Sequence, residues 1–242
     1  MERKLKLLLV ISILASFVAF LDGSVVNVAL PSIIRHLGGD LAVQQWIVDA
    51  YLLTLGSLIL LAGSLSDIFG RKTILVIGLI SFGVASVLCA LAPNYTFLII
   101  SRAIQGVGGA LLVPSSLAII ISNFKGKSKS KAIGTWTAWT GIAFIVGPLL
   151  GGFLVDDFSW RLIFAINVLP IAVCLWLLFK LELEEHKARV KLDAVGAVLC
   201  SLGLFGTVFA LIEQPNYGWG SSLILVPFIL GVLILIGFIV YE

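Results

Sequence analysis

Eight apolar runs, each of about 20 residues, alternate with short polar segments along this chain of 242 residues. About 20 apolar residues is the length that an α-helix needs to cross a hydrocarbon layer of about 30 Å. Lipid offers no hydrogen-bond partner to an open backbone, and a β-barrel would show short alternating segments instead. The pattern therefore predicts an all-α fold, a polytopic membrane helix bundle. The expected spans are 7–30, 44–61, 73–91, 95–121, 132–155, 161–179, 192–211 and 222–240.

The composition excludes several other classes of protein. Apolar residues make up 60% of the chain and charged residues 12%, whereas an ordinary soluble domain is about a quarter charged. A disordered tail, a secreted disulfide scaffold and a typical soluble enzyme are all excluded on this ground. Cys89, Cys174 and Cys200 lie inside apolar runs without a CxxC partner, so we expect them to be reduced and buried.

Lysine and arginine fall mainly on one side of the predicted membrane. With the N-terminus in the cytoplasm, 13 of the 16 cations lie on the cytoplasmic side, and the outer side carries Arg35 and Arg161. Cytoplasmic loops of membrane proteins carry such an excess. We therefore expect a multi-pass protein of the plasma (cytoplasmic) membrane with a cytoplasmic N-terminus. The charged stretch 180–193 is then cytoplasmic, and His186 within it is expected to be a surface residue.

Three charged side chains lie inside the expected spans, where burial in lipid is costly and each charge suggests a function. At a rise of about 1.5 Å per residue, Asp22 and Arg102 lie at nearly the same depth, in the outer third of the membrane. A nearby cation and desolvation act in opposite directions on the proton affinity of a carboxylate, so small rearrangements can make it exchange a proton. Asp22 and Arg102 are therefore the expected proton-coupling pair. The alternative is a static ion pair that only positions the helices.

The third charge, Asp49, lies nearer the outer surface, where water can reach it. If all three charges faced one cavity, the cavity would favour a cation or a proton over an anion. The other candidate residues of a substrate cavity are Tyr51, Gln105, Trp136 and Trp139. Packing or lipid-facing roles fit the aromatic members of this set equally well.

Small residues recur along the fifth span. Ala143, Gly147 and Gly151 are spaced by four residues, so they form one helix face that lets a neighbouring helix approach closely. Pro148 removes a backbone donor and can kink the helix. The span is therefore expected to be closely packed and bendable. The alternative is ordinary packing without a moving part.

The loop after the second span combines glycines with charges. Its sequence is GSLSDIFGRK, with Gly63, Asp67, Gly70, Arg71 and Lys72. Asp67 is expected either to cap a helix N-terminus or to pair with Arg71.

Five motifs, in order and on the matching spans, resemble those of the major facilitator superfamily, and more narrowly of its drug/proton antiporters with 14 spans. They are LDGSVVNVALPSI with Asp22, GSLSDIFGRK with Asp67 and Arg71, SRAIQGVGGA with Arg102 and Gln105, GIAFIVGPLLGG with Gly147, Pro148, Gly151 and Gly152, and WRLIFAINVLP from Trp160 to Pro170. Asp49 departs from the resemblance, because many relatives have a neutral residue there.

The resemblance implies an organisation and a function. The expected parts are an N-terminal six-span bundle (1–180), a cytoplasmic linker (181–191) and two additional spans (192–242), with the C-terminal six-span bundle absent from this chain. The implied function is secondary active transport, in which protons exchange for a lipophilic, often cationic compound by alternating access. The proton gradient would supply the energy, with no cofactor and no metal.

The resemblance also implies roles for single residues. Asp22 and Arg102 would take part in proton coupling, and the loop around Asp67 and Arg71 would lock the cytoplasmic gate. The span-five motif, with Gly147 and Pro148, would shape a helix interface. The expected partners are the lipid bilayer, a small-molecule substrate and the missing C-terminal half, in cis or in trans, with no nucleic acid.

Three other interpretations remain at this point. A metabolite uniporter or symporter would have the same spans, and a truncated membrane scaffold would not transport at all. Because alternating access needs two halves, we expect no transport by this chain alone. An enzyme is disfavoured, since the sequence lacks metalloprotease, hydrolase and P-loop motifs.

Overall fold

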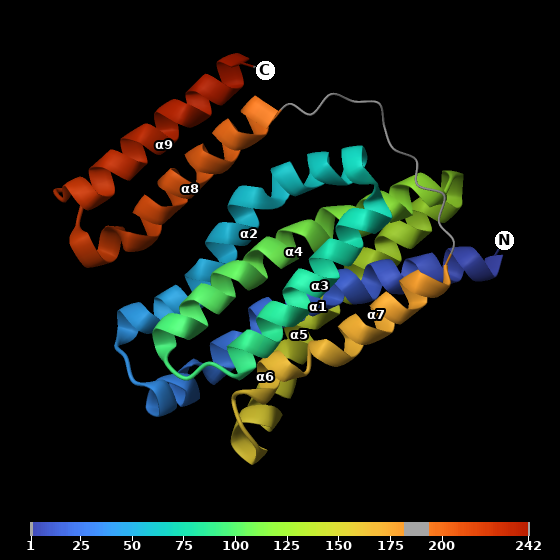
Figure 1. The fold of residues 1–242 in the computed structure, drawn as a ribbon, viewed down its shortest axis with the longest axis horizontal. Helices are drawn as coiled ribbons and strands as arrows, with labels where there is room; N and C mark the ends of the chain where they lie inside the picture. The colour runs from blue at the N-terminus through green and yellow to red at the C-terminus, as the bar shows by residue number, and fades with distance from the viewer. Residues whose placement is uncertain (1, 182–193, 242) are drawn as a thin grey trace.

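The computed structural model describes residues 2–181 and 194–241, which form a helical bundle (Figure 1) without strands in these ranges. The helices are α1 (Glu2–Leu37), α2 (Leu41–Phe69), α3 (Arg71–Ala90), α4 (Tyr95–Asn123), α5 (Gly126–Asp157), α6 (Leu162–Ala165), α7 (Val168–Lys180), α8 (Ala194–Tyr217) and α9 (Ser222–Tyr241). Eight helical segments are long and apolar enough to cross a membrane, with α6 and α7 together forming the sixth. The predicted all-α fold is therefore confirmed.

Local sequence signals set the helix boundaries. Asp40 accepts a hydrogen bond from the backbone nitrogen of Val43 at 3.0 Å, and Asn94 accepts one from Phe97 at 2.8 Å, so both cap the helices that follow. Gly70 separates α2 from α3 with a φ of +102°, a conformation that only glycine adopts readily. Several helices extend beyond the predicted spans, because polar residues at their ends continue the helix outside the apolar run.

The sixth span, predicted as one continuous helix, is interrupted in the structure. Ile166 and Asn167 form a turn between α6 and α7, in which the backbone nitrogen of Asn167 donates to Phe164 at 3.2 Å. Pro170 has no N–H to donate to the carbonyl of Ile166, and its ring crowds that carbonyl. Pro170 thus leaves this carbonyl without its helical donor at the interruption, although the prolines inside α1, α4, α5, α8 and α9 do not interrupt those helices.

Close helix contacts hold the bundle together at glycines of α4. A Cβ at Gly108 would lie 2.7 Å from the backbone nitrogen of Phe82 on α3, and one at Gly106 would overlap the side chain of Thr54 on α2. Thr54 also donates to the Ala103 carbonyl of α4 at 2.9 Å. Packing of small residues drives helix association in lipid, and here it holds α4 between α2 and α3.

The last two helices form a hairpin beside α2 (Figure 1). Gly231 of α9 would bring a Cβ within 2.5 Å of the Thr207 backbone nitrogen on α8, so the two backbones nearly touch. Trp46 of α2 and Phe209 of α8 pack with ring centroids 5.9 Å apart. The expected linker lies outside the described residues except for Leu181, and His186 is among the residues outside.

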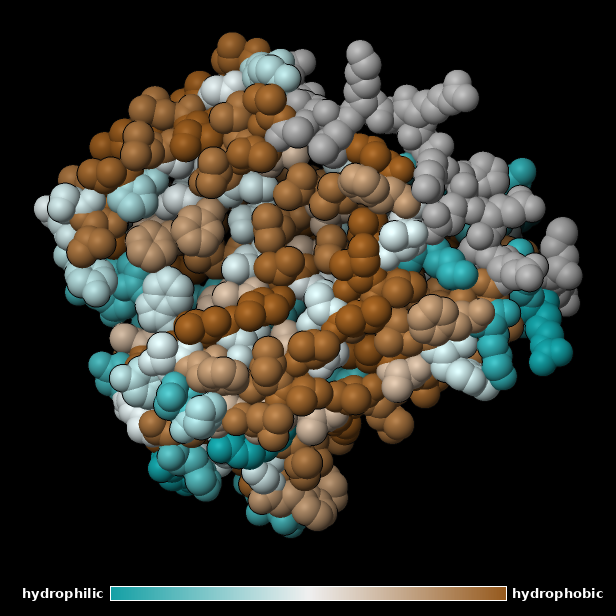
Figure 2. Space-filling view, in the orientation of Figure 1, coloured by the Kyte–Doolittle hydropathy of each residue, from teal (hydrophilic) through white to brown (hydrophobic). Residues whose placement is uncertain are grey.

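Two large buried apolar clusters fill the bundle, one toward each end, and a third, smaller cluster contains Ile120, Phe124 and Ala132. Along α1, Val18 and Ala19 belong to the first cluster, whereas Val25 and Val26 belong to the second. Figure 2 shows that apolar side chains also cover much of the visible outer face, with hydrophilic residues gathered toward opposite ends of the helices. An apolar girdle between polar ends is what a multi-pass membrane protein presents to lipid.

Candidate functional site

Asp22 of α1 and Arg102 of α4 form an ion pair between the two large apolar clusters. The side chains of Asp22 and Arg102 are 0% and 1% exposed, and Nη1 of Arg102 donates a hydrogen bond to Oδ2 of Asp22. Desolvation of two charges opposes their attraction, so a buried ion pair persists only when its other atoms are also well bonded. Asp22 and Arg102, which the sequence places at nearly the same depth in the membrane, are therefore in direct contact.

Two amide side chains and a hydroxyl complete the surroundings of this pair. Gln105 Nε2 donates to Asp22 Oδ1 at 2.9 Å, and Asn167 Nδ2 donates to the same oxygen at 2.7 Å. Ser86 of α3 accepts from Gln105 at 2.9 Å. Gln105 Oε1 in turn accepts from Arg102 Nη1 at 2.7 Å. We refer to Asp22, Ser86, Arg102, Gln105 and Asn167 as the polar network, which joins four of the spans.

The guanidinium of Arg102 is also held by groups outside this network. Its Nε donates to the Ile47 carbonyl of α2 at 3.1 Å. Its central carbon lies 4.2 Å from the ring centroid of Tyr51 and 5.7 Å from that of Phe164. Tyr51 is fixed in turn, since its hydroxyl donates to the Ala19 carbonyl at 2.9 Å. Cation–π contact and hydrogen bonds together fix the position of the charge.

Sequence reasoning missed two members of the polar network, Ser86 and Asn167. Both are neutral, and a neutral polar residue within a span is a weak signal by itself. For Asn167 the signal is also weak, because Pro170 three residues later marks a place where a helix can break, but the prolines inside five other described helices leave those helices continuous. For Ser86 we find none.

The expected cavity residues have different surroundings in the structure. Tyr51 and Gln105 are 2% and 0% exposed, so both are packing members of the site rather than open lining. Trp136 is half-buried, and its Nε1 donates to the hydroxyl of Ser16 on α1 at 3.1 Å. Trp139 is 47% exposed.

Asp49 lies apart from the polar network. Its side chain is half-buried on α2, within electrostatic range of Glu213 on α8. Glu213 is 4% exposed and accepts a hydrogen bond from Asn216 at 3.1 Å. The three charges that the sequence analysis singled out therefore do not form one cluster.

The motif between α2 and α3 forms a compact set of hydrogen bonds. Arg71 Nη2 donates to Asp67 Oδ1 at 3.0 Å, so Asp67 pairs with Arg71 instead of capping a helix. Arg71 Nη1 also donates to the Ala118 carbonyl of α4 at 3.0 Å. Lys72 Nζ donates to the Leu181 carbonyl at 2.9 Å. These bonds join α2, α3, α4 and the C-terminal end of α7.

The small-residue face of α5 packs on α1. A Cβ at Gly147 would overlap the hydroxyl of Ser24, and one at Gly151 would lie 2.8 Å from a valine methyl group of α1. Pro148 is exposed, and around Gly152 a Cβ would meet nothing within 4 Å. The same holds for Gly63 of the α2–α3 motif. The expected close packing is therefore present, on the face that carries Gly147 and Gly151.

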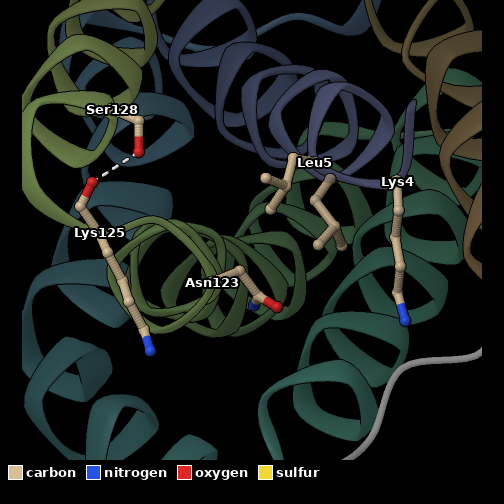
Figure 3. Close-up of a pocket in the computed structure, with 6 residues that line it drawn as sticks. Lys4, Leu5, Asn123, Lys125 and Ser128 are labelled. Atoms are coloured by element: carbon tan, nitrogen blue, oxygen red, sulfur yellow. Dashed lines mark hydrogen bonds between the residues drawn. The ribbon is translucent and has the colours of Figure 1, made fainter. Parts of the chain in front are cut away.

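A cavity of about 450 Å³ opens at the end of the bundle that holds the N-terminus (Figure 3). Its lining comes from α1, from the end of α4 and from the start of α5, namely Lys4, Leu5, Leu8, Asn123, Lys125 and Ser128. Ser128 donates to the Lys125 carbonyl at 2.6 Å. None of these residues belongs to the polar network, so the cavity is a separate feature.

The polar network contains one carboxylate, Asp22, which is ion-paired with Arg102. Asp22 is the acid, and Arg102, Gln105 and Asn167 are hydrogen-bond donors to it. In the described parts of the chain, no group of three or more His, Cys, Asp or Glu residues could hold a metal ion.

Comparison with known proteins gives close relatives of about twice this length. The chain is 36% identical to the multidrug transporter protein MdtP of Bacillus subtilis over 244 aligned residues, covering 100% of this chain and 45% of that protein. It is 38% identical to the puromycin resistance protein pur8 of Streptomyces alboniger, covering 97% and 47%. The chain thus spans about half the length of the curated relatives that it matches.

Solved structures agree on the fold. A crystal structure of a peptide transporter, POT, in complex with sulfate superimposes with a TM-score of 0.71 at 17% identity, covering 98% of this chain and 52% of that one. A bacterial homologue of the human lysosomal transporter Spinster gives 0.67 at 19% identity, covering 94% and 59%.

A family model agrees with these relatives over nearly the whole chain. The model described as Major Facilitator Superfamily matches residues 12–241. The resemblance expected from the five motifs is thereby confirmed. This chain belongs to the major facilitator superfamily, a family of membrane transporters and not of enzymes.

Proposed function

We propose that this chain is the N-terminal part of a secondary transporter that exports lipophilic, often cationic compounds in exchange for protons. The observation that carries the proposal is the ion pair of Asp22 and Arg102, which is buried among donors contributed by several spans. An ionisable residue inside a membrane is costly and marks an ion or substrate pathway. The names of MdtP and pur8, a multidrug transporter and a puromycin resistance protein, support export of such compounds.

The coupling step assigned to Asp22 is reversible protonation. In its ionised form the carboxylate pairs with Arg102, and protonation removes the charge that holds this pair together. Arg102 would then lose its main counter-ion and bias α4 toward a different packing against α1. Alternation between two such arrangements couples proton movement to movement of the substrate.

A second half is part of the proposal. In carriers of this kind two halves rock around a site near the middle of the membrane. The turn that holds Asp67 and Arg71 forms the gate contact with that half, and the exposed face of α5 with Pro148 and Gly152 provides further contact area. The half would be supplied in cis or in trans.

The remaining elements of the proposal follow from the charge distribution. An excess of cations at the N-terminal end of the bundle favours a cytoplasmic N-terminus in the plasma membrane. The proton gradient is the energy source, and neither a cofactor nor a metal is needed. The substrate is a small molecule that reaches the site from the bilayer or the cytoplasm.

The proposal is tested by ethidium efflux from energised cells that express the complete reading frame containing this chain. We expect efflux that stops when the proton gradient is dissipated, and that is lost in Asp22→Asn. Asp156→Asn is the matched control, because Asp156 is exposed near the end of α5. The same loss in both variants, or efflux that survives Asp22→Asn with its pH dependence unchanged, contradicts the proposal.

Two alternatives give different results in the same assay. A metabolite uniporter or symporter would not extrude ethidium against its gradient. A membrane scaffold would show no movement that depends on Asp22. Efflux by the 242-residue chain alone would contradict the need for a second half.

A further inference from the structure

The side-chain amide of Asn167 has one atom without a hydrogen-bond partner, although this amide contacts Asp22. Asn167 is 1% exposed, and its Oδ1 accepts no hydrogen bond from any described residue. Its Nδ2 donates to Asp22 Oδ1 at 2.7 Å and to Ser86 Oγ at 3.5 Å. A buried carbonyl oxygen without a donor is unfavourable, so its persistence beside a titratable acid calls for a functional reason.

The groups around Asp22 suit only the ionised acid. Arg102, Gln105 and Asn167 all donate to its carboxylate oxygens. A carboxylate is an acceptor only, whereas a protonated carboxyl group also carries an O–H donor that needs an acceptor. When Asp22 takes up a proton, the new O–H group therefore needs an acceptor that the present hydrogen bonds do not provide.

Most groups near the acid cannot supply that acceptor. Arg102 has donors only. Gln105 Oε1 already accepts from Arg102 at 2.7 Å and from Cys89 Sγ at 3.5 Å. The hydroxyl of Tyr51 donates to the Ala19 carbonyl of α1, and no hydrogen bond joins it to Asp22 in the described part of the chain. In the described part of the chain, the titratable groups that face Asp22 are Arg102, Tyr51 and Cys89.

We propose that Asn167 is a positioning residue whose amide rotates with the protonation state of Asp22. With the ionised acid, Nδ2 donates to the carboxylate, as observed. When a proton adds to a carboxylate oxygen, a half-turn of the amide about its Cβ–Cγ bond presents Oδ1 as acceptor for the new O–H. The inference rests on the proposed proton-coupling function of Asp22 and extends it to a residue of the sixth span.

The position of Asn167 in the chain makes this rotation consequential. It lies in the turn between α6 and α7, where Pro170 leaves the Ile166 carbonyl without its helical donor. Rotation of the Asn167 amide therefore changes the hydrogen bonds at the turn where the sixth span is interrupted. Protonation on α1 is thereby transmitted to the sixth span.

The test is infrared difference spectroscopy of the whole chain in nanodiscs, between high and low pH, with ¹³C-labelled asparagine side chains. Two bands are expected in the unmutated chain. One is the carbonyl band of protonated Asp22, which Asp22→Asn removes. The other is a shifted band of a labelled asparagine amide, which disappears in Asp22→Asn and in Asn167→Leu. The control variant Asn123→Leu, at the exposed end of α4, keeps both bands.

Each outcome decides a different claim. A carboxyl band from Asp22 without a dependent asparagine band overturns the inference about Asn167 and leaves the proposed function standing. Absence of any carboxyl band that depends on Asp22 contradicts the proposed function itself. If Asn167→Leu fails to fold, the labelled band is still compared between the unmutated chain and Asp22→Asn, and an asparagine band that titrates in both overturns the inference.

Discussion

Gly147 of α5 and Ser24 of α1 approach so closely that the glycine has no room for a side chain. A Cβ at Gly147 would overlap Ser24 Oγ and would lie 3.3 Å from the backbone nitrogen of Val25. Ser24 is held in position, because its hydroxyl donates to the carbonyls of Leu21 and Ala143 at 2.9 and 3.1 Å. Contact between the two helices therefore depends on this glycine.

Gly147→Ala is expected to destabilise the bundle. Forcing a methyl group into a filled contact costs about 1–3 kcal/mol, and here it also displaces the serine hydroxyl. The measurement is the free energy of unfolding in detergent. Gly152→Ala, on the same helix with open space around it, is the matched control, and equal losses in the two variants would rule out the packing argument.

Arg102→Ala is expected to be more damaging than Gly147→Ala. It leaves the fully buried carboxylate of Asp22 without its counter-ion, and breaking a buried pair in this way costs about 3–5 kcal/mol. Adding Asp22→Asn to Arg102→Ala removes the stranded charge, so part of the loss should return. The two residues would not be coupled if Asp22→Asn lowered the free energy of unfolding of Arg102→Ala by as much as it lowers that of the unmutated protein.

The spans could be predicted from the sequence because lipid fixes the length and apolar character of a membrane helix. The depth of a residue in its span could also be estimated, which is why Asp22 and Arg102 were expected together. The rotation of each helix about its own axis could not be predicted, because this rotation is set by the packing between spans. Asp49 therefore lies apart from the pair, and Tyr51 is buried beneath Arg102 instead of lining an open cavity.

Asp67→Asn should separate transport from stability. The side chains of Asp67 and Arg71 are 49% and 31% exposed, and exposed pairs contribute roughly 0.2–1 kcal/mol. The free energy of unfolding should thus change by less than about 1 kcal/mol, whereas efflux by the complete protein should fall strongly because the gate contact is lost. Asp157→Asn, exposed at the end of α5, serves as control. Unimpaired efflux in Asp67→Asn would remove the gate assignment.

The three cysteines should not react in the folded protein. Cys89, Cys174 and Cys200 are free and buried, as expected from their position in apolar runs. A membrane-permeant maleimide should label none of them in the native chain and all three after denaturation in SDS, as counted by mass spectrometry. Rapid labelling of Cys89 in the native chain would contradict this burial, and it would show that reagents reach the polar network, because Cys89 contacts Gln105.

The most direct test of the account is a measurement of protons released when a substrate binds. Purified complete protein in weakly buffered detergent solution receives a compound that the efflux assay finds to be exported, and a pH-sensitive dye reports the protons released. We predict release by the unmutated protein and by Asp156→Asn, and no release by Asp22→Asn at the same occupancy. Undiminished release from Asp22→Asn would contradict the claim that this buried carboxyl group carries the coupled proton.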